Sequence, residues 1–345
     1  MRTRIAVISD TRAADGPYGI DLLEGLGYVL TQASPARHAW HRKLRDVIEH
    51  RTGVPSEHVF RSMQLVRDAD VVLAFLESHA QLPSALRARR IRPFATTPLA
   101  MIACWLADDL RRLPATERRR LAGRYRGVDL TMVFSANQID VLIDAGFHEG
   151  SVEAIPFGFA PQQHPPVDFG TRDSSIVAVG FDRGRDYTTL FEAVQGTDLH
   201  VDLYCSEGNI AASRLPENVT FHGVVPYDEY RAVISRAGIV AVPTSEMAYP
   251  SGQTVALEAA ATGACIALTS TPALLEYFSP ATALLLPAHD PREWRAGLLR
   301  AAGDPAVRER LGSAACDHVH AHFTYESMWR HVDALFRSRG WVREG

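Results

Sequence analysis

The most constraining feature of this sequence is a strand-like run, a polar loop and a helical run over residues 238–263. Residues 238–243 are short and apolar, as in a fully buried strand. A polar loop follows, and the alanine-rich run after it closes at Gly263, where a helix is expected to end. Residues 265–268 then form a second apolar run. This order predicts a strand–loop–helix–strand unit of a parallel α/β sheet.

The loop of this unit lies at the carboxyl end of a strand and the amino end of a helix. Backbone N–H groups there are unpaired and the helix dipole is positive, so the position favours an anion such as a phosphate. The candidate binding residues in this turn are Ser251, Gly252, Gln253 and Thr254. Glu258 lies about one turn into the helix, so we expect it beside the anion rather than at it.

This stretch resembles the donor-binding segment of the retaining glycosyltransferases of family 4, which have the two-domain fold called GT-B. In that family the second glutamate of an E-x7-E pattern binds the ribose of the sugar nucleotide, and Glu258 matches it. Pro250 replaces the first glutamate, although some relatives carry the Ser-Gly-Gln turn that begins here at Ser251. The loop is longer than usual, which leaves open whether Glu246 supplies the missing carboxylate. The alternative is another nucleotide-binding unit or a plain α/β crossover.

Length and composition indicate a soluble α/β protein of two domains. The chain has 345 residues, of which 46% are hydrophobic and 22% charged, and a chain of this length suits two domains better than one. There is no apolar run of about 18 residues, so no transmembrane helix is expected. The amino terminus resembles a first strand rather than a secretion signal. The four cysteines are scattered, which favours reduced thiols and a cytoplasmic location.

The N-terminal half contains candidate residues at the ends of predicted strands. Gly16 and Gly19 lie in the loop after the first strand, and the resemblance implies that this loop covers the donor phosphates and the acceptor. Residues 70–76 form a strong buried-strand pattern, followed by Glu77 and His79. Polar residues at the carboxyl end of a parallel strand lie where α/β proteins bind ligands. Because the family has a histidine near this place that approaches the donor sugar, His79 is a candidate catalytic residue and Glu77 a second one.

Neither a metal nor another cofactor is expected. Asp68 and Asp70 spell the D-x-D of metal-using transferases, but they precede their strand, at the wrong end of it, so we interpret them as a chance match. No other cluster suggests a metal site. Lys43 is the only lysine, which argues against a pyridoxal-dependent phosphorylase.

Two segments are rich in positive charge. Residues 37–51 predict a basic amphipathic helix, and residues 111–126 contain seven arginines. Either segment could contact an anionic acceptor, and the first could contact a membrane surface; the alternative is an ordinary solvated helix face. Aromatic residues are not interleaved with the arginines, so a nucleic-acid partner is not expected.

The second half carries further matches to the family. Residues 152–159 resemble its Ile-Pro-x-Gly-Val segment, which ends the first domain, and a proline-rich linker follows. The family then has an arginine and a lysine that clamp the donor diphosphate. Arg185 falls at the lysine position; Phe181 stands where the arginine is expected, and Arg183 is the nearest substitute. A guanidinium binds phosphate oxygens in a bidentate fork. Val225 matches a position whose backbone contacts the nucleobase.

The sequence therefore predicts two doubly wound Rossmann-like domains that face each other across a cleft. The first domain is expected over residues 1–160 together with a C-terminal helix at about 324–345, and the donor-binding domain over residues 172–323. The resemblance implies a retaining, metal-independent transferase that moves a sugar from a nucleotide-diphosphate sugar to a small-molecule, glycan or lipid-linked acceptor. Two alternatives are a GT-B sugar-nucleotide epimerase and a non-catalytic sugar-nucleotide-binding partner protein.

Overall fold

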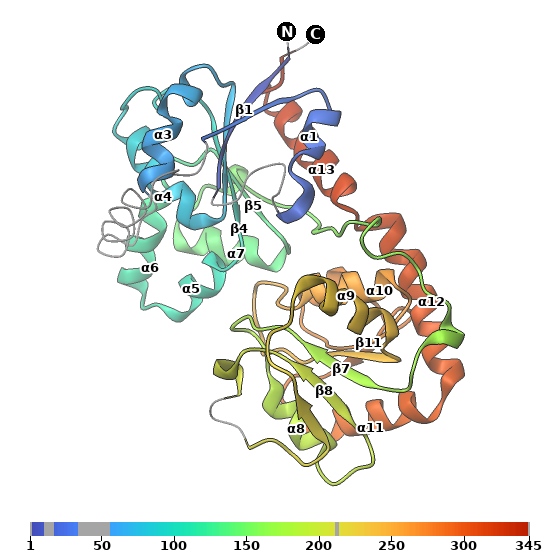
Figure 1. Ribbon diagram of the computed structural model, residues 1–345. Coiled ribbons are helices and arrows are strands. Elements are labelled where there is room, and N and C mark those ends of the chain that lie inside the picture. The colour runs from blue at the N-terminus through green and yellow to red at the C-terminus, as the bar shows by residue number, and fades with distance from the viewer. Residues whose placement is uncertain (1, 10–16, 34–55, 211–213, 344–345) are drawn as a thin grey trace, which may run out of the picture. The chain divides into compact units, whose positions relative to one another are not determined.

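The computed structural model describes residues 2–9, 17–33, 56–210 and 214–343. The chain forms two compact units. Unit 1 comprises Met1–Pro156 and Tyr325–Gly345, and unit 2 comprises Phe157–Thr324. Unit 2 is therefore inserted between two parts of unit 1, and each unit is described below by itself (Figure 1).

Unit 1 alternates strands and helices along most of its length (Figure 1). Its strands are β1 (Arg4–Ile8), β2 (Val29–Gln32), β3 (Val71–Phe75), β4 (Leu99–Ala103), β5 (Leu130–Val133) and β6 (Val152–Ala154). Its helices are α1 (Leu22–Gly25), α3 (Ser56–Arg67), α4 (Glu77–Ala88), α5 (Leu106–Arg112), α6 (Ala115–Ala122), α7 (Asn137–Ala145) and α13 (Tyr325–Ser338). The short 3-10 turns are η1 (Pro17–Gly19), η2 (Gly123–Tyr125) and η3 (Glu149–Ser151).

The strands of unit 1 form one parallel sheet in the order β2-β1-β3-β4-β5-β6. The strands β1, β3, β4 and β5 are almost continuous apolar runs, as expected for a parallel sheet with helices on both faces. The strand order reverses between β1 and β3. This reversal is the point at which doubly wound sheets bind ligands, and Glu77 directly follows β3 there.

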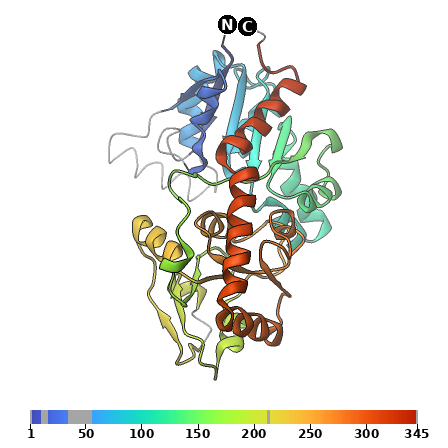
Figure 2. The same cartoon turned by 90° about the vertical axis from the view of Figure 1, so that its right-hand side faces the viewer.

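The terminal helix α13 belongs to unit 1 and packs against α1 and the turn η1 with its apolar side. Met328, Trp329, Val332 and Phe336 are buried, as the spacing of apolar residues predicts. Trp329 Nε1 donates a hydrogen bond to the carbonyl of Tyr18. The amide of the last described residue, Arg343, donates a hydrogen bond to Thr3 Oγ1 at 2.8 Å, so both ends of the described chain lie together in unit 1 (Figures 1 and 2).

Unit 2 has the same alternating pattern. Its strands are β7 (Ile176–Val179), β8 (Val201–Tyr204), β9 (Val219–Phe221), β10 (Ile239–Val242), β11 (Cys265–Thr269) and β12 (Leu284–Leu286). Its helices are α8 (Tyr187–Val194), α9 (Tyr227–Arg236), α10 (Gln253–Ala261), α11 (Pro291–Gly303) and α12 (Pro305–His322). Three short turns are η4 (Phe169–Thr171), η5 (Glu207–Asn209) and η6 (Leu274–Glu276). The elements β10, α10 and β11 confirm the strand, helix and strand predicted over residues 238–268.

The sheet of unit 2 is also parallel, in the order β12-β11-β10-β7-β8-β9. Helices α8 and α11 lie on one face of it and α9 and α10 on the other, with the long helix α12 beside α10 (Figures 1 and 2). The strand order reverses between β7 and β10, which pair directly. The loops that follow these two strands therefore meet at the switch point of the sheet, where α/β proteins bind nucleotides.

Both sheets confirm the predicted α/β class with two doubly wound domains. Among the described residues, none of the helices is long and apolar enough to cross a membrane.

Candidate functional site

The candidate site lies at the switch point of unit 2, where the loop after β7 and the loop after β10 are tied together. The amide of Asp186 donates to the carbonyl of Pro243 at 3.0 Å, and the amide of Ser245 donates to the carbonyl of Gly184 at 2.9 Å. These backbone bonds fix residues 180–186 beside residues 243–252. The sequence-predicted residues Arg185 and Ser251 are thereby brought together.

Asp182 is the link between these two loops. Its Oδ2 lies 2.7 Å from Nε of Arg185, and its Oδ1 accepts hydrogen bonds from Ser251 Oγ at 2.5 Å and from the amide of Gly184 at 3.0 Å. Burial by itself would raise the pKa of Asp182. The charge of Arg185 and the hydrogen bonds from Ser251, Arg185 and Gly184 outweigh it and lower that pKa. Asp182 is therefore a carboxylate that orients Arg185.

Two glycines form a narrow slot around the Arg185 guanidinium. A Cβ on Gly180 would lie 2.2 Å from Nη2, and a Cβ on Gly252 would lie 3.1 Å from Nη1 and 2.4 Å from a methyl carbon of Val242. Both glycines also have positive φ, at 130° and 83°, which side chains rarely adopt. Glycine is thus required at both positions so that the guanidinium fits into the switch point.

One nitrogen of this guanidinium is buried without a hydrogen-bond partner in the described part of the chain. The Arg185 side chain is only 3% exposed, and its Nη1 has no hydrogen-bond partner among the residues that the structure describes. Nη1 lies next to Gly252, the residue that precedes the first turn of α10. A buried guanidinium N–H and the unpaired amides of a helix amino end together favour an anion. This arrangement is suited to the phosphates of a nucleotide.

Glu258 lies in the second turn of α10 and is 6% exposed. Its Oε2 accepts a hydrogen bond from the hydroxyl of Tyr230, in the first turns of α9, at 2.5 Å. Its Oε1 lies 3.4 Å from Nε2 of His164. The same His164 nitrogen lies 3.0 Å from the hydroxyl of Tyr227, which in turn donates to Gln163. Glu258 is therefore held in place by side chains from two separate segments, the loop residue His164 and helix α9.

Tyr230 acts only as a donor in this network. Burial, and then the charge and the hydrogen bond of Glu258, raise the pKa of Tyr230 well above its usual value. The phenol therefore keeps its proton, and its hydrogen bond leaves the remaining lone pairs of the carboxylate for other donors. Ribose hydroxyls are donors of this kind.

The other predicted residues of unit 2 lie around this site with different exposure. Gln253 is buried and donates to the hydroxyl of Tyr249 at 3.2 Å. Thr254 and Val225 are half-buried, whereas Arg183 and Glu246 are exposed. Phe181, at the position of the family's arginine, is 67% exposed. The structure thus places Arg185 in the switch point and Arg183 at its surface.

The predicted residues of unit 1 lie at the carboxyl edge of its own sheet. Glu77 begins α4, and its two carboxylate oxygens accept hydrogen bonds from the amides of Cys104 and Trp105 at 3.0 and 2.9 Å. His79 is 2% exposed, with Nδ1 3.5 Å from the hydroxyl of Ser78. Gly19 has a φ of 57°. Gly16 and the basic segment 37–51 lie outside the described residues.

The D-x-D pair lies at the amino end of β3, away from these residues. Asp70 accepts a hydrogen bond from the amide of Arg4 and pairs with Arg343. In the described parts of the chain, no three His, Cys, Asp or Glu side chains are arranged to hold a metal ion.

Sequence reasoning did not identify Asp182, Tyr230 or His164. Each lies in a loop or a first helical turn, and each reaches the site through a contact with a residue far along the chain: Ser251 for Asp182, and Glu258 for the other two. The pattern of residues within one segment does not predict contacts of this kind, because they join segments that are far apart in the sequence.

Comparisons with known proteins agree with this geometry. Residues 185–334 match a family model described as glycosyl transferase-like. No curated protein matches the sequence. Among solved structures, the chain is similar to sucrose-phosphate synthase from Thermosynechococcus elongatus, with a TM-score of 0.73, 19% identity, and 98% of this chain and 99% of that one covered.

Two further similarities cover the whole length. Anabaena HepE in complex with UDP-glucose has a TM-score of 0.70 at 14% identity, with 98% of this chain and 100% of that one covered. An E. coli structure described as trehalose-6-phosphate bound with UDP-2-fluoro glucose has a TM-score of 0.67 at 13% identity, with 99% and 100% covered. The chain therefore has the GT-B fold of two Rossmann-like domains, and most of its second unit is similar in sequence to glycosyl transferase-like proteins.

Proposed function

We propose that this protein is a retaining, metal-independent glycosyltransferase of family 4 that uses a nucleotide-diphosphate sugar as donor. The observation that carries the proposal is the switch point of unit 2. There the buried Arg185, oriented by Asp182, lies beside the amino end of α10, and Glu258 follows in the same helix. The guanidinium of Arg185 and the amino end of α10 supply the positive charge that binds a diphosphate. The carboxylate of Glu258 supplies the acceptors for the ribose hydroxyls.

The proposed roles follow from charge and position. Negative charge develops on the diphosphate as the glycosidic bond breaks, and groups that are already oriented stabilise it without reorganisation. Arg185 and the amino end of α10 after Gly252 supply this stabilisation, with Arg183 at the surface of the same loop. Glu258 accepts hydrogen bonds from the ribose. The backbone of Val225 contacts the nucleobase in this proposal, as the resemblance to the family implies.

The retaining outcome rests on the resemblance. We name no side chain as a nucleophile, and we propose that the acceptor attacks on the face from which the diphosphate departs. In unit 1, His79 is the residue that we propose to approach the donor sugar. The acceptor is a small molecule, a glycan or a lipid-linked sugar, and the location is proposed to be cytoplasmic.

UDP-glucose is the first donor to test, because HepE was solved in complex with it. A thermal-shift panel of UDP-, GDP-, ADP- and dTDP-sugars identifies the nucleotide. A ligand at ~100 times its dissociation constant adds about 2.7 kcal/mol of stability, which such a panel detects. Absence of a shift with every nucleotide sugar would contradict the proposed donor site.

Turnover of the selected donor, labelled in its sugar, distinguishes a transferase from an epimerase and from a non-catalytic binding protein. Label that moves to an acceptor with retained anomeric configuration supports the proposal. An epimerised nucleotide sugar indicates an epimerase, and binding without any turnover indicates a partner protein, for which the missing first glutamate at Pro250 is the supporting feature. Activity that is lost in EDTA and restored by Mg²⁺ or Mn²⁺ would contradict the metal-independent mechanism.

A further inference from the structure

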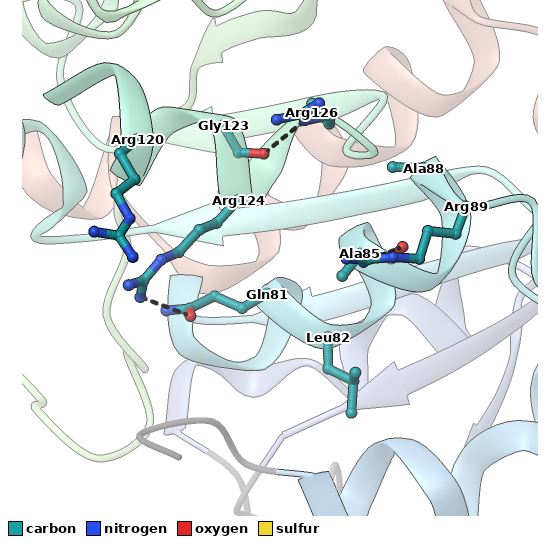
Figure 3. A pocket seen from close by; sticks show the side chains of 9 residues that line it. All are labelled: Gln81, Leu82, Ala85, Ala88, Arg89, Arg120, Gly123, Arg124 and Arg126. Atoms are coloured by element: carbon teal, nitrogen blue, oxygen red, sulfur yellow. Dashed lines mark hydrogen bonds between the residues drawn. The ribbon is translucent and has the colours of Figure 1, made fainter. Parts of the chain in front are cut away.

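Unit 1 has a polar cavity on its surface, beside the helices α4 and α6. It has a volume of about 590 Å³ and is formed by the last turns of α4, the end of α6 and the turn η2. Four arginines line it: Arg89, Arg120, Arg124 and Arg126. Figure 3 shows Arg120 and Arg124 extending toward the same side, next to Gln81. Neither Glu77 nor His79 lines this cavity, so it is separate from the candidate residues of unit 1.

The positive charge in this cavity is not neutralised by the protein residues that line it. No carboxylate is among the lining residues. Arg124 donates to the amide oxygen of Gln81 at 3.4 Å, Arg126 to the carbonyl of Gly123 at 2.9 Å and Arg89 to the carbonyl of Ala85 at 3.3 Å. Within the described residues, none of the four arginines forms an ion pair. Arg87, only two residues before Arg89, is paired with Asp129 at 2.9 Å and points elsewhere.

The backbone that carries these arginines is firmly packed. The amide of Gly127 donates to Ser84 Oγ at 3.0 Å, and a Cβ on Gly127 would lie 2.3 Å from the carbonyl oxygen of Ser84. Gln81 Nε2 donates to the hydroxyl of the buried Tyr125 at 3.1 Å. Helix α4 and turn η2 are thus in direct contact, and Gln81 connects this contact to Arg124. The backbone beneath the cavity is therefore fixed, while the four arginine side chains are exposed to a ligand.

We propose that this arginine cavity is a binding site for a ligand that carries phosphate groups. Guanidinium groups recognise phosphate oxygens through bidentate hydrogen bonds. The volume is that of a small-ligand site, and the lining is charged rather than apolar, which suits a sugar phosphate or a diphosphate. A phospholipid headgroup has the same chemistry, so the experiment separates the two sources. The site does not depend on the proposed transferase activity.

The test measures binding of pyrophosphate and of fructose 1,6-bisphosphate by isothermal titration calorimetry. In a second arm, the protein is sedimented with phosphatidylglycerol vesicles and with phosphatidylcholine vesicles. The test variant is Arg120→Gln/Arg124→Gln. The matched control is Arg67→Gln/Arg111→Gln, which removes the same charge from exposed positions of unit 1 outside the cavity.

We expect the test variant to weaken binding of its ligand about tenfold or more, since it removes hydrogen bonds to a charged group, while the control changes it less than about twofold. Calorimetric binding without sedimentation identifies a free ligand. Sedimentation with phosphatidylglycerol alone, competed by pyrophosphate, identifies a headgroup. Equal losses in both variants would show a diffuse charge effect and would overturn the proposal, as would the absence of binding in both arms.

Discussion

The hydroxyl of Tyr230 donates a hydrogen bond to Oε2 of Glu258, and this bond joins the first turns of α9 to the second turn of α10. The carboxylate is therefore oriented before any ligand arrives. His164, near the other oxygen, restrains it from the opposite side. A carboxylate held in this way forms hydrogen bonds to a ribose at a lower entropy cost than a free one.

Replacing Glu258 should weaken nucleotide binding. Glu258→Gln keeps the shape of the side chain but removes its charge, and we expect a loss of ~1.5–3 kcal/mol, the range for hydrogen bonds to a charged group. This corresponds to a Kd increase of about 10- to 150-fold for the nucleoside diphosphate. Tyr230→Phe keeps the charge and should cost ~0.5–1.5 kcal/mol. Calorimetry measures both. Unchanged affinity in a folded Glu258→Gln protein would remove Glu258 from the site.

Specificity for the donor sugar should be low at one position. In the resembling family the first glutamate of the pattern grips sugar hydroxyls, and Pro250 has neither a carboxylate nor an N–H here. A site without that group should reject a deoxy donor less strongly. The measurement compares kcat/KM for a hexose donor and its deoxy analogue. A preference of ~10⁴-fold or more that Glu246→Ala abolishes would instead show that Glu246 has replaced the missing glutamate.

Gly252→Ala should destabilise unit 2 more than an alanine at another left-handed glycine. The new methyl group would lie 2.4 Å from Val242 and 3.1 Å from Arg185. Gly196 has a similar φ of 73°, but a methyl group added there would have no atom within 4 Å, so Gly196→Ala isolates the backbone strain. Crowding should add about 1–3 kcal/mol to the cost in Gly252→Ala. Urea unfolding of both variants tests this. Equal denaturation midpoints for the two variants would contradict the close packing of Gly252 against Val242 and Arg185.

The Asp182–Arg185 pair should contribute to stability above pH 4 and lose this contribution in acid. The pKa of Asp182 is lowered in the folded state relative to an unfolded value of about 3.9. Its contribution is therefore fully present above the unfolded pKa and disappears as the pH falls through the folded one. The Tm difference between wild type and Asp182→Asn should be constant from pH 7 to 5 and shrink below about pH 4. Asp198→Asn, at an exposed position, controls for the change in net charge.

Two thiols of unit 2, those of Cys205 and Cys265, should be unreactive in the folded protein. Burial raises the pKa of Cys205 to about 11 and that of Cys265 to about 12, and these side chains are 0% and 1% exposed. The thiolate is the reactive form, so a thiol reagent at pH 8 should label neither until the protein is unfolded by denaturant. Rapid labelling of Cys265 in the native state would contradict the packing of β11.

The local pattern of the chain predicts most of unit 2. Apolar runs at β10 and β11 and the glycine after α10 define a parallel unit, and this unit places Glu258 correctly near a helix amino end. The conformation of the loops was not predictable in this way. Asp182 was passed over because its role depends on Ser251, 69 residues away. The resemblance assigns Arg185 to the lysine position and Arg183 as the nearest substitute for the arginine. In the structure, two glycines and one carboxylate hold Arg185 in the interior, whereas Arg183 is exposed.

The insertion of unit 2 within unit 1 has a consequence for synthesis on the ribosome. Unit 2 is continuous, so all of its strands are available once Thr324 has left the exit tunnel. Unit 1 lacks α13 until residues 325–338 are made, and Trp329 and Phe336 fill its core only then. Nascent chains therefore carry an open apolar face beside α1 and η1 until α13 has been made. Unit 2 can therefore complete its fold before α13 is made, whereas unit 1 can complete its fold only afterwards.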